Sequence, residues 1–334
     1  MPRSRVTIRD VAAHAGVSHQ TVSRVINKTK GVNPDTRAKV DTAITELGYS
    51  PNAVARSMAR GRTCMMGCIS PNLTDFTFAS IIEGAESEAR KQDYFLVSSS
   101  AADEDNFSKL IEEMVGSRRV EGLMVINPYA DARHKLLPKD FPIVYVGAHP
   151  REEKVSSISL DDIKAAQIAT KHLIDIGHLR IAMVTGPLVE DCTQDRCTGY
   201  QYALESAGIT YDPDLVIQGD WSATSGYDAA MILVNTKNKP TAIFAQNDRM
   251  AIGVLRATRE LGWSVPEELA VIGIDDMPLS SYFDPPLTTM QQDILDIGQK
   301  AARMLIQAVE NPQSPIQHQF VQAKLITRES TVCP

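Results

Sequence analysis

Two short amphipathic helix patterns, separated by a tight turn near the N-terminus, most constrain what this chain can fold into. Thr7 is placed to cap the first helix, with Asp10 at its N3 position. Gly16 then permits a turn with positive φ, and Ser18 is placed to cap the second helix. The apolar faces recur at helical spacing and consist of Ile8, Val11 and Ala12 in the first helix and of Val22, Val25 and Ile26 in the second.

A third helix is predicted from about residue 34 to residue 47. Pro34 suits its first turn, and Gly48 suits its end. Val17 would fill the space between the first two helices. The short connection is typical of a helix-turn-helix, so residues 6–49 are predicted to form a compact all-α head. Its third helix would point inward through Val40, Ala43, Ile44 and Leu47.

The outer face of the second helix carries side chains that can read DNA. Glutamine can pair with adenine and arginine with guanine, while hydroxyl groups and a helix N-terminus suit phosphates. The alternative is an ordinary polar, solvent-exposed face, which any surface helix has. The predicted DNA-facing residues are Thr7, Ser18, His19, Gln20, Thr21, Ser23, Arg24 and Asn27.

The charge of the chain is divided unevenly. Residues 1–62 hold eleven Lys and Arg but four Asp and Glu, which gives a net charge of +7. The whole chain has a net charge of −7, so the remainder carries −14. A basic head on an acidic body favours a polyanionic partner for the head alone.

The segment RVTIRDVAAHAGVSHQTVSRVIN closely resembles the DNA-binding head of the LacI/GalR regulators. GVSxxTVSRVIN is a highly specific signature of that family. The resemblance implies a transcriptional repressor that binds a pseudo-palindromic operator as a homodimer. It also implies that His19 and Gln20 carry much of the operator discrimination.

A short hinge is expected after the head, over residues 50–62. Pro51 disfavours helix at Ser50, and Asn52 can cap about two turns of a new helix. Such a short helix is marginal alone and is expected to fold on DNA. The resemblance implies that it enters the minor groove, where Met58 would wedge a base step. A flexible linker is the alternative, and the expected contacts are Asn52, Ala55, Arg56 and Met58.

From residue 63 to residue 334, short apolar runs alternate with helix-length segments. The runs MMGCIS, YFLVSSS, VEGLMVIN, FPIVYVG, LRIAMVTG, PTAIFAQ and LAVIGID are predicted strands. This alternation predicts an α/β core with parallel sheets, in which ligands sit beyond the carboxyl ends of strands. Polar residues follow three of the runs at that edge, namely Asn127, Asn247, Asp248, Asp275 and Asp276.

This core resembles the two-lobed periplasmic-binding-protein-like fold that the same regulators use. Matching patches include KHLIDIGHLRIAMVTGP, QGDWSATSGYDAA and PPLTTMQQD. The resemblance implies an N-lobe of about residues 63–160 and 293–319, and a C-lobe of about residues 161–292 and 320–330. It implies three crossovers, near residues 160, 292 and 320. No heptad repeat ends the chain, so we expect dimers rather than tetramers.

The resemblance also places a small-molecule site between the lobes. Arg196, Asn247 and Asp275 match hydroxyl-binding positions, and Trp221 would stack on the apolar face of a sugar. The weaker candidates are Phe76, Phe78, Ile81, Tyr145, Leu160 and Gln292. The expected ligand-binding residues are Asn127, Arg196, Trp221, Asn247, Asp275, Gln292, Phe78, Ile81 and Leu160.

Three positions depart from the pattern of galactoside-binding members, namely Pro71, Gly147 and Ile294. Gly147 stands where those members have an aspartate, whose loss would cost about 1.5–3 kcal/mol of charge-assisted hydrogen bonding. We therefore expect a related sugar or glycoside as inducer. The alternative within the family is a corepressor of the purine type.

Other classes of protein are less well supported. GxGxxG, HExxH, GxSxG and the phosphate-binding GxxxxGK motif are absent from the sequence, so an enzyme is not expected. His172 and His178 fit cap or core roles. The five cysteines include no CxxC pair, and no metal or cofactor is expected from Cys192 and Cys197. With no long apolar stretch and no signal core, the expected compartment is the cytoplasm.

Overall fold

The computed structural model describes residues 6–27, 31–50, 61–129, 131–151, 154–236 and 239–332. The chain divides into two compact units, a head (Met1–Thr63) and a core (Cys64–Pro334). The expected hinge contacts at Asn52, Ala55, Arg56 and Met58 lie outside the described residues.

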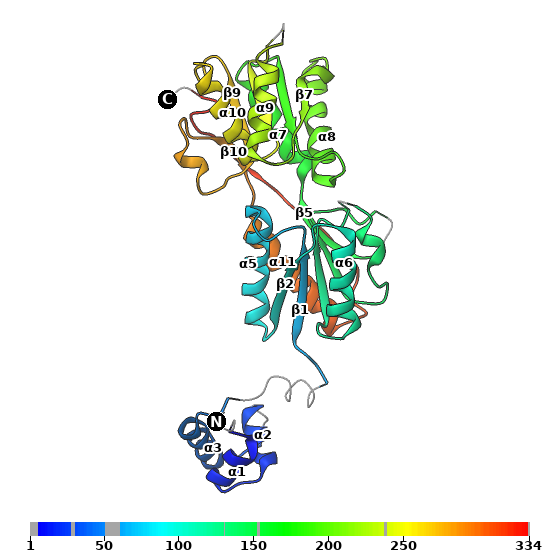
Figure 1. The fold of residues 1–334 in the computed structure, drawn as a ribbon, viewed down its shortest axis with the longest axis vertical. Coiled ribbons are helices and arrows are strands. Elements are labelled where there is room, and N and C mark those ends of the chain that lie inside the picture. The colour runs from blue at the N-terminus through cyan, green and yellow to red at the C-terminus, as the bar shows by residue number, and fades with distance from the viewer. Residues whose placement is uncertain are drawn as a thin grey trace. The chain divides into compact units, whose positions relative to one another are not determined.

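The head is a helical unit whose predicted caps are present. Its helices are α1 (Ile8–Ala15), α2 (His19–Ile26) and α3 (Pro34–Leu47) (Figure 1). The Thr7 hydroxyl accepts a hydrogen bond from the amide of Asp10, while the Asp10 carboxylate accepts one from the amide of Thr7 at 2.8 Å. Gly16 and Gly48 end α1 and α3 at φ values of 68° and 59°. Burial of Val11, Val22 and Val40 closes a small apolar core, which fixes the outer face of α2.

The N-lobe of the core is built on a parallel sheet with the order β11-β5-β4-β3-β1-β2. One face is covered by α5 (Phe76–Lys91) and α11 (Ile294–Glu310), and the other by α6 (Glu104–Ile111). Both faces are buried, which explains the continuous apolar runs of its central strands. The strands are β1 (Met65–Ser70), β2 (Phe95–Ser100), β3 (Gly122–Ile126), β4 (Ile143–Val146), β5 (Ser156–Leu160) and β11 (His318–Val321).

The C-lobe repeats this plan with the strand order β12-β10-β9-β8-β6-β7, in which β12 is antiparallel to β10. Helices α7 (Asp162–Asp175) and α8 (Asp191–Ser206) cover one face. Helices α9 (Ala223–Leu233) and α10 (Asp248–Glu260) cover the other. The strands are β6 (Ile181–Thr185), β7 (Val216–Gln218), β8 (Ala242–Ala245), β9 (Ala270–Asp275), β10 (Thr288–Gln291) and β12 (Lys324–Ile326).

The chain passes between the lobes from β5 to α7, from β10 to α11 and from β11 to β12. The two-lobed α/β architecture predicted from the sequence is therefore confirmed. The structure adds β5, β7, β10, β11 and β12 to the predicted strands. Strand β5 is easily missed because its sequence, SSISL, is rich in serine, yet Ser157 and Ser159 are buried in it.

Within the described part of the chain, no helix is long and apolar enough to cross a membrane. The described cysteines Cys64, Cys68, Cys192 and Cys197 are free thiols. His172 and His178 hold loops by hydrogen bonds to the hydroxyls of Thr331 and Thr241, both at 2.9 Å.

Candidate functional site

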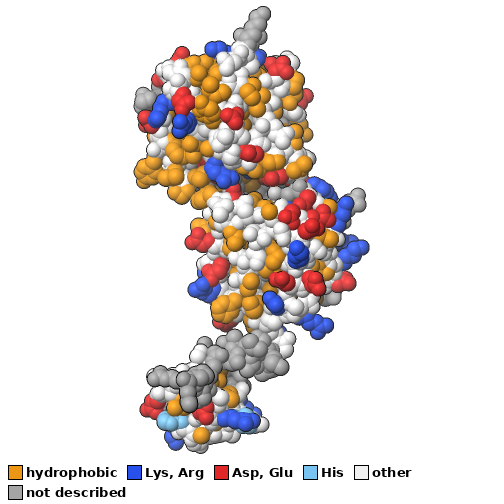
Figure 2. Space-filling view, in the orientation of Figure 1, with side chains coloured by type: hydrophobic (Ala, Val, Ile, Leu, Met, Phe, Trp, Pro, Cys, Tyr) orange, Lys and Arg blue, Asp and Glu red, His pale blue; other side chains and the backbone are white. Residues whose placement is uncertain are grey.

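The first candidate site is the outer face of α2 in the head. Ser18, His19, Gln20 and Arg24 are exposed, whereas the remaining predicted readers Thr21, Ser23 and Asn27 are half-buried. Lysine, arginine and histidine side chains lie on the visible surface of the head (Figure 2). The face therefore presents an amide, an imidazole and a guanidinium outward, with the helix behind them anchored by apolar contacts.

Two of the predicted DNA-facing residues also fix the ends of helices. The Ser18 hydroxyl accepts a hydrogen bond from the amide of Thr21 at 3.2 Å, so it caps α2. The Thr7 hydroxyl donates to the Asp10 carboxylate at 2.8 Å and so belongs to the capping box of α1. A phosphate contact by either hydroxyl would share the atom with its cap.

The second candidate site is a cavity of about 80 Å³ between the two lobes of the core. Binding pockets for small molecules span about 300–1,000 Å³, so this cavity is smaller than a typical ligand pocket. The cavity is also lined by Gly147, Asp162, Glu190 and Cys192. The predicted ligand residues that reach it are Asn127, Arg196, Gln292, Phe78, Ile81 and Leu160.

A buried ion pair forms the C-lobe side of this cavity. The Arg196 Nε atom of α8 donates to Asp162 Oδ1 at the start of α7 at 2.6 Å, and both side chains are less than a tenth exposed. A second guanidinium nitrogen donates to the carbonyl of Gln246, which follows β8. Burial raises the pKa of the Asp162 carboxyl, while the positive charge of Arg196 opposes that rise. The pair is neutral as a unit, and it links both helices of one face to the sheet.

Trp221 does not line the cavity itself but packs against Arg196, which does. The Arg196 guanidinium carbon is 5.6 Å from the centre of the indole ring, within cation–π range. Gly186 makes this position possible, because a β-carbon there would come within 2.1 Å of the ring. The backbone of Trp221 is left-handed at φ 70°, and its carbonyl accepts a hydrogen bond from the Asn247 amide at 3.2 Å.

Asp275 ends β9 and is reached through Gln292. The Gln292 amide donates to Asp275 Oδ1 at 2.7 Å, and it is Gln292 that lines the cavity. Burial raises the pKa of the Asp275 carboxyl well above its usual range, and the neighbouring charge of Asp248 adds to the rise. Asp275 and Trp221 do not themselves line this cavity.

Two acidic residues that follow predicted strands have structural roles. Asp248 is fully buried and accepts hydrogen bonds from the hydroxyls of Ser280 and Thr289 and from the amide of Met277. Burial raises its pKa to about 6. Asp276 forms a 2.6 Å ion pair with Arg328. Each carboxyl group is thereby occupied within the C-lobe.

The structure corrects two weaker candidates for the cleft. Tyr145 is buried on the other face of the N-lobe sheet, where its ring meets the edge of Tyr129. Phe76 packs against the apolar cluster beneath α5 and does not line the cavity. The strand and the helix that carry these residues were predicted from the sequence. The hydrophobic pattern did not show toward which face each side chain points.

Glu190 is a cavity-lining residue that sequence reasoning missed. Its carboxylate accepts a hydrogen bond from Trp221 Nε1 at 3.2 Å. Burial raises the pKa of the Glu190 carboxyl. Asn127 lines the cavity from the N-lobe and Glu190 lines it from the C-lobe. The sequence feature that could have identified Glu190 is its position shortly after β6, at the carboxyl end of the strands, where the other candidates lie.

Ion pairs also join the rims of the two lobes. Asp75, which caps α5, is bound by Arg249 of α10 at 2.5 Å. In the loop after β4, Arg151 contacts Asp191 at 2.8 Å, and His149 contacts Asp195 at 2.5 Å. The largest cause of the raised pKa of His149 is its hydrogen bond with Asp195. These contacts hold the lobes closed.

The residues at the cleft can bind a polar ligand. Carboxylates and amides can accept or donate hydrogen bonds to hydroxyl groups, and Trp221 offers a flat apolar face. Among the described residues, no group of three or more His, Cys, Asp and Glu is arranged to hold a metal ion. Burial raises the pKa of the Cys192 thiol, which disfavours the thiolate that a nucleophile or metal ligand requires.

Comparisons with known proteins agree with this arrangement. A family model described as bacterial regulatory proteins, lacI family, matches residues 7–52, and one described as a periplasmic binding protein-like domain matches residues 170–331. The HTH-type transcriptional repressor PurR of Photorhabdus laumondii is 36% identical over 330 residues, which is 98% of this chain and 97% of that protein.

Two solved structures are similar over almost the whole chain. The lac repressor dimer bound to operator and the anti-inducer ONPF has a TM-score of 0.89 at 31% identity, covering 99% of this chain and 100% of that one. The complex of the transcriptional regulator CelR with cellobiose has a TM-score of 0.77 at 32% identity, covering 98% and 100%.

The Arg196–Asp162 pair generates a prediction about stability. Replacing Arg196 by Met should lower the free energy of unfolding by about 3–5 kcal/mol, because it leaves a buried carboxylate without its partner. The double variant Arg196→Met/Asp162→Leu should recover part of that loss. Urea denaturation of the three proteins checks this. A double variant as unstable as the single one would show that the pair is not the source of the effect.

The His149–Asp195 contact generates a prediction about pH. Because the folded-state pKa of His149 is raised, the stabilisation is complete below the unfolded value of about 6.5. It is then lost as pH rises through the raised value. The melting temperature should therefore drop more on Asp195→Asn substitution at pH 6 than at pH 9. An equal drop at both values would contradict a charged His149.

Proposed function

Because this chain belongs to the LacI family of bacterial regulatory proteins and is a DNA-binding repressor of that family, we propose that the interlobe cleft controls its grip on an operator. In this scheme residues 1–49 read DNA, residues 50–62 form a hinge helix, and residues 63–334 hold an effector. The observation that carries the proposal is the outer face of α2, which is held outward by buried Val22 and Val25.

We propose that α2 lies in the major groove. Gln20 and Arg24 would contact base edges, and His19 would modulate the choice at the first positions. The N-terminus of α2 points its free amides at the phosphate backbone. Asn52, Ala55, Arg56 and Met58 would contact the minor groove, with Met58 as the apolar wedge. The contrast of the basic head with the acidic core keeps DNA at the head.

We propose that a homodimer is the working unit. The solved lac repressor is a dimer on its operator, and it aligns with almost all of this chain. A dimer presents two copies of α2, so the operator should consist of two half-sites related by pseudo-twofold symmetry. Light scattering of the purified chain measures the mass directly.

We propose that the effector is a sugar or glycoside that acts as an inducer. The solved CelR complex holds cellobiose. Here Trp221 and Phe78 offer apolar faces, and Glu190, Asp275 and Asn127 offer acceptors and donors around them. A ligand with several hydroxyl groups and no negative charge fits this acid-rich lining best. Gly147 lines the cavity, and the space beside its Cα is open. A sugar ligand with a larger substituent than a galactoside carries would therefore fit at this position.

A second candidate effector is a corepressor of the purine type. Several of the curated relatives are repressors called PurR. A purine ring can stack on Trp221 as well as a pyranose can. The two candidates predict opposite signs, because an inducer weakens operator binding and a corepressor strengthens it.

Catalysis is not part of this proposal. The relatives are transcriptional repressors, and the cleft carboxyl groups are engaged by partners, as Asp162 is by Arg196 and Asp275 by Gln292. A glycoside incubated with the purified chain should be recovered unchanged. Release of an aglycone that depends on Asp275 would contradict this.

The head generates the first functional prediction. A duplex selected from a random library should bind the full chain in preference to unselected DNA. Gln20→Ala and Arg24→Ala should each weaken binding to the selected duplex by about 5–150-fold, since one base contact is worth about 1–3 kcal/mol. Fluorescence anisotropy at a fixed salt concentration measures both.

The matched control for this experiment is Lys109→Ala, an exposed residue of the core. It should leave operator binding unchanged. Gln20→Ala should have little effect on unselected DNA, because that binding depends on phosphates. If Gln20→Ala and Lys109→Ala behaved alike on the selected duplex, α2 would not be the reading helix.

The cleft generates the second prediction. In a thermal-shift screen of neutral disaccharides, glycosides and purines, the true effector should raise the melting temperature, because it binds the native state. Trp221→Ala should remove that rise. A sugar that raises the melting temperature and weakens operator binding supports the inducer assignment. A purine that tightens operator binding would replace it with the corepressor assignment.

A further inference from the structure

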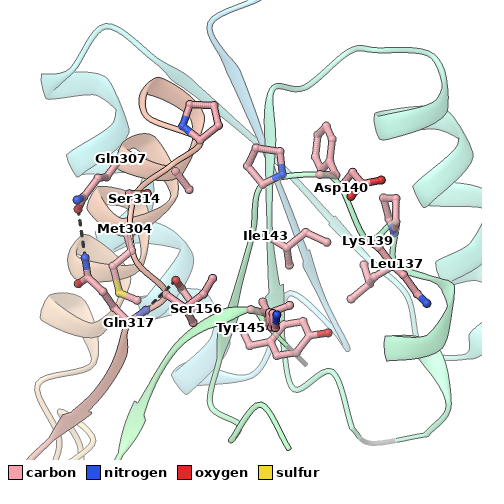
Figure 3. Close-up of a pocket in the computed structure, with 18 of the residues that line it drawn as sticks. Leu137, Lys139, Asp140, Ile143, Tyr145, Ser156, Met304, Gln307, Ser314 and Gln317 are labelled. Atoms are coloured by element: carbon pink, nitrogen blue, oxygen red, sulfur yellow. Dashed lines mark hydrogen bonds between the residues drawn. The ribbon is translucent and has the colours of Figure 1, made fainter. Parts of the chain in front are cut away.

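We propose that the N-lobe carries a second small-molecule site, distinct from the interlobe cleft, which binds an anionic amphiphile. The ligand class is a carboxylate, sulfonate or phosphate ester with an apolar body. The site is a cavity of about 1010 Å³ between the segment 137–142 and the segment 312–317 that follows α11 (Figure 3). It exceeds the interlobe cavity more than tenfold in volume.

The site lies at the opposite edge of the N-lobe sheet from the cleft. It is lined by Ile143, Ser156 and Gln317, which lie at or just before the first residues of β4, β5 and β11. These strands are parallel, so their other ends lead to the cleft, where Leu160 is found. The chain enters β1 at this same edge, two strands from β4 in the sheet.

The floor of the cavity is apolar and firmly held. Ile143, Tyr145 and Met304 line it and are themselves almost completely buried, so the floor is part of the packed lobe. Phe141 and Ile316 extend the apolar lining on the two walls. Figure 3 shows Met304 and Gln317 on one side and Leu137 and Asp140 on the other, with Ile143 and Tyr145 between. Such a floor suits the apolar body of a ligand.

The rim of the cavity is positively charged. Among the described residues that line it, the basic side chains are Lys135, Lys139 and Lys154 and the acidic one is Asp140. The three lysines are exposed, and none forms an ion pair with another described residue. The interlobe cleft has the opposite character, with Asp162 and Glu190 beside Arg196. A negative head group is therefore favoured at this rim and disfavoured in the cleft.

A lining histidine adds a polar group without a partner. The Nδ1 atom of His134 is buried and makes no hydrogen bond with any described residue. Its ring packs against Tyr129, with 4.8 Å between the ring centres. Because this atom has almost no accessible surface, the histidine contributes a packed wall to the cavity and not a hydrogen-bond contact for the ligand.

The test uses the full chain and 8-anilinonaphthalene-1-sulfonate, a fluorescent anion with a large apolar body. Its fluorescence should rise in a saturable titration. Lys139→Glu/Lys154→Glu should weaken binding at least tenfold, because it reverses the charge of the rim. The control Lys109→Glu/Arg119→Glu makes the same charge change at exposed positions of the same lobe outside the cavity and should have no effect.

Two further measurements test the position of the site and the charge of its ligand. Ala308→Trp fills the cavity from α11 and should also remove binding. The neutral probe N-phenyl-1-naphthylamine keeps the apolar body without the sulfonate and should bind at least tenfold more weakly. Unchanged affinity in Lys139→Glu/Lys154→Glu, whose positions are exposed and tolerate substitution, would overturn the site. Equal affinity for the neutral probe would overturn the anionic ligand class.

Discussion

The buried guanidinium of Arg196 is the constraint on which the geometry of the cleft depends. A positive charge in the interior must be paired, and here Asp162 at the start of α7 and the carbonyl after β8 do so. The arginine comes from α8, so the pair fixes two helices against the C-lobe sheet. Its other face supports Trp221, whose indole is in turn bound by Glu190. One satisfied charge therefore positions the C-lobe side of the cavity and the tryptophan behind it.

Much of the fold could be predicted from local chemistry. The caps at Thr7 and Ser18, the left-handed Gly16 and the apolar spacing of α2 depend on neighbours in sequence, so the pattern gave the head correctly. The buried strands were visible because both faces of a parallel sheet are apolar. Strand β5 was missed because its serines are buried by tertiary contacts that composition does not show.

The candidate cleft was only partly predictable, because its contacts join residues that are distant in sequence. The rule that ligands bind beyond strand ends pointed to Asn127, which lines the cavity, and to Asp275, which lies behind Gln292. It could not show that Glu190 lines the cavity, or that the Asp248 carboxylate accepts hydrogen bonds from hydroxyl groups of its own lobe. The rim pairs Asp75–Arg249 and His149–Asp195 have the same origin. They hold the lobes closed and so oppose entry of a ligand.

In the proposed function, the effector bound in the cleft changes the affinity of the head for its operator. Because such coupling is reciprocal, an effector that changes operator affinity by some factor must have its own affinity changed by the same factor by the operator. Titrating the effector identified by thermal shift against the full chain, free and saturated with operator, measures this most directly. The account predicts equal factors from the two titrations. An effector affinity that is the same with and without operator would contradict it.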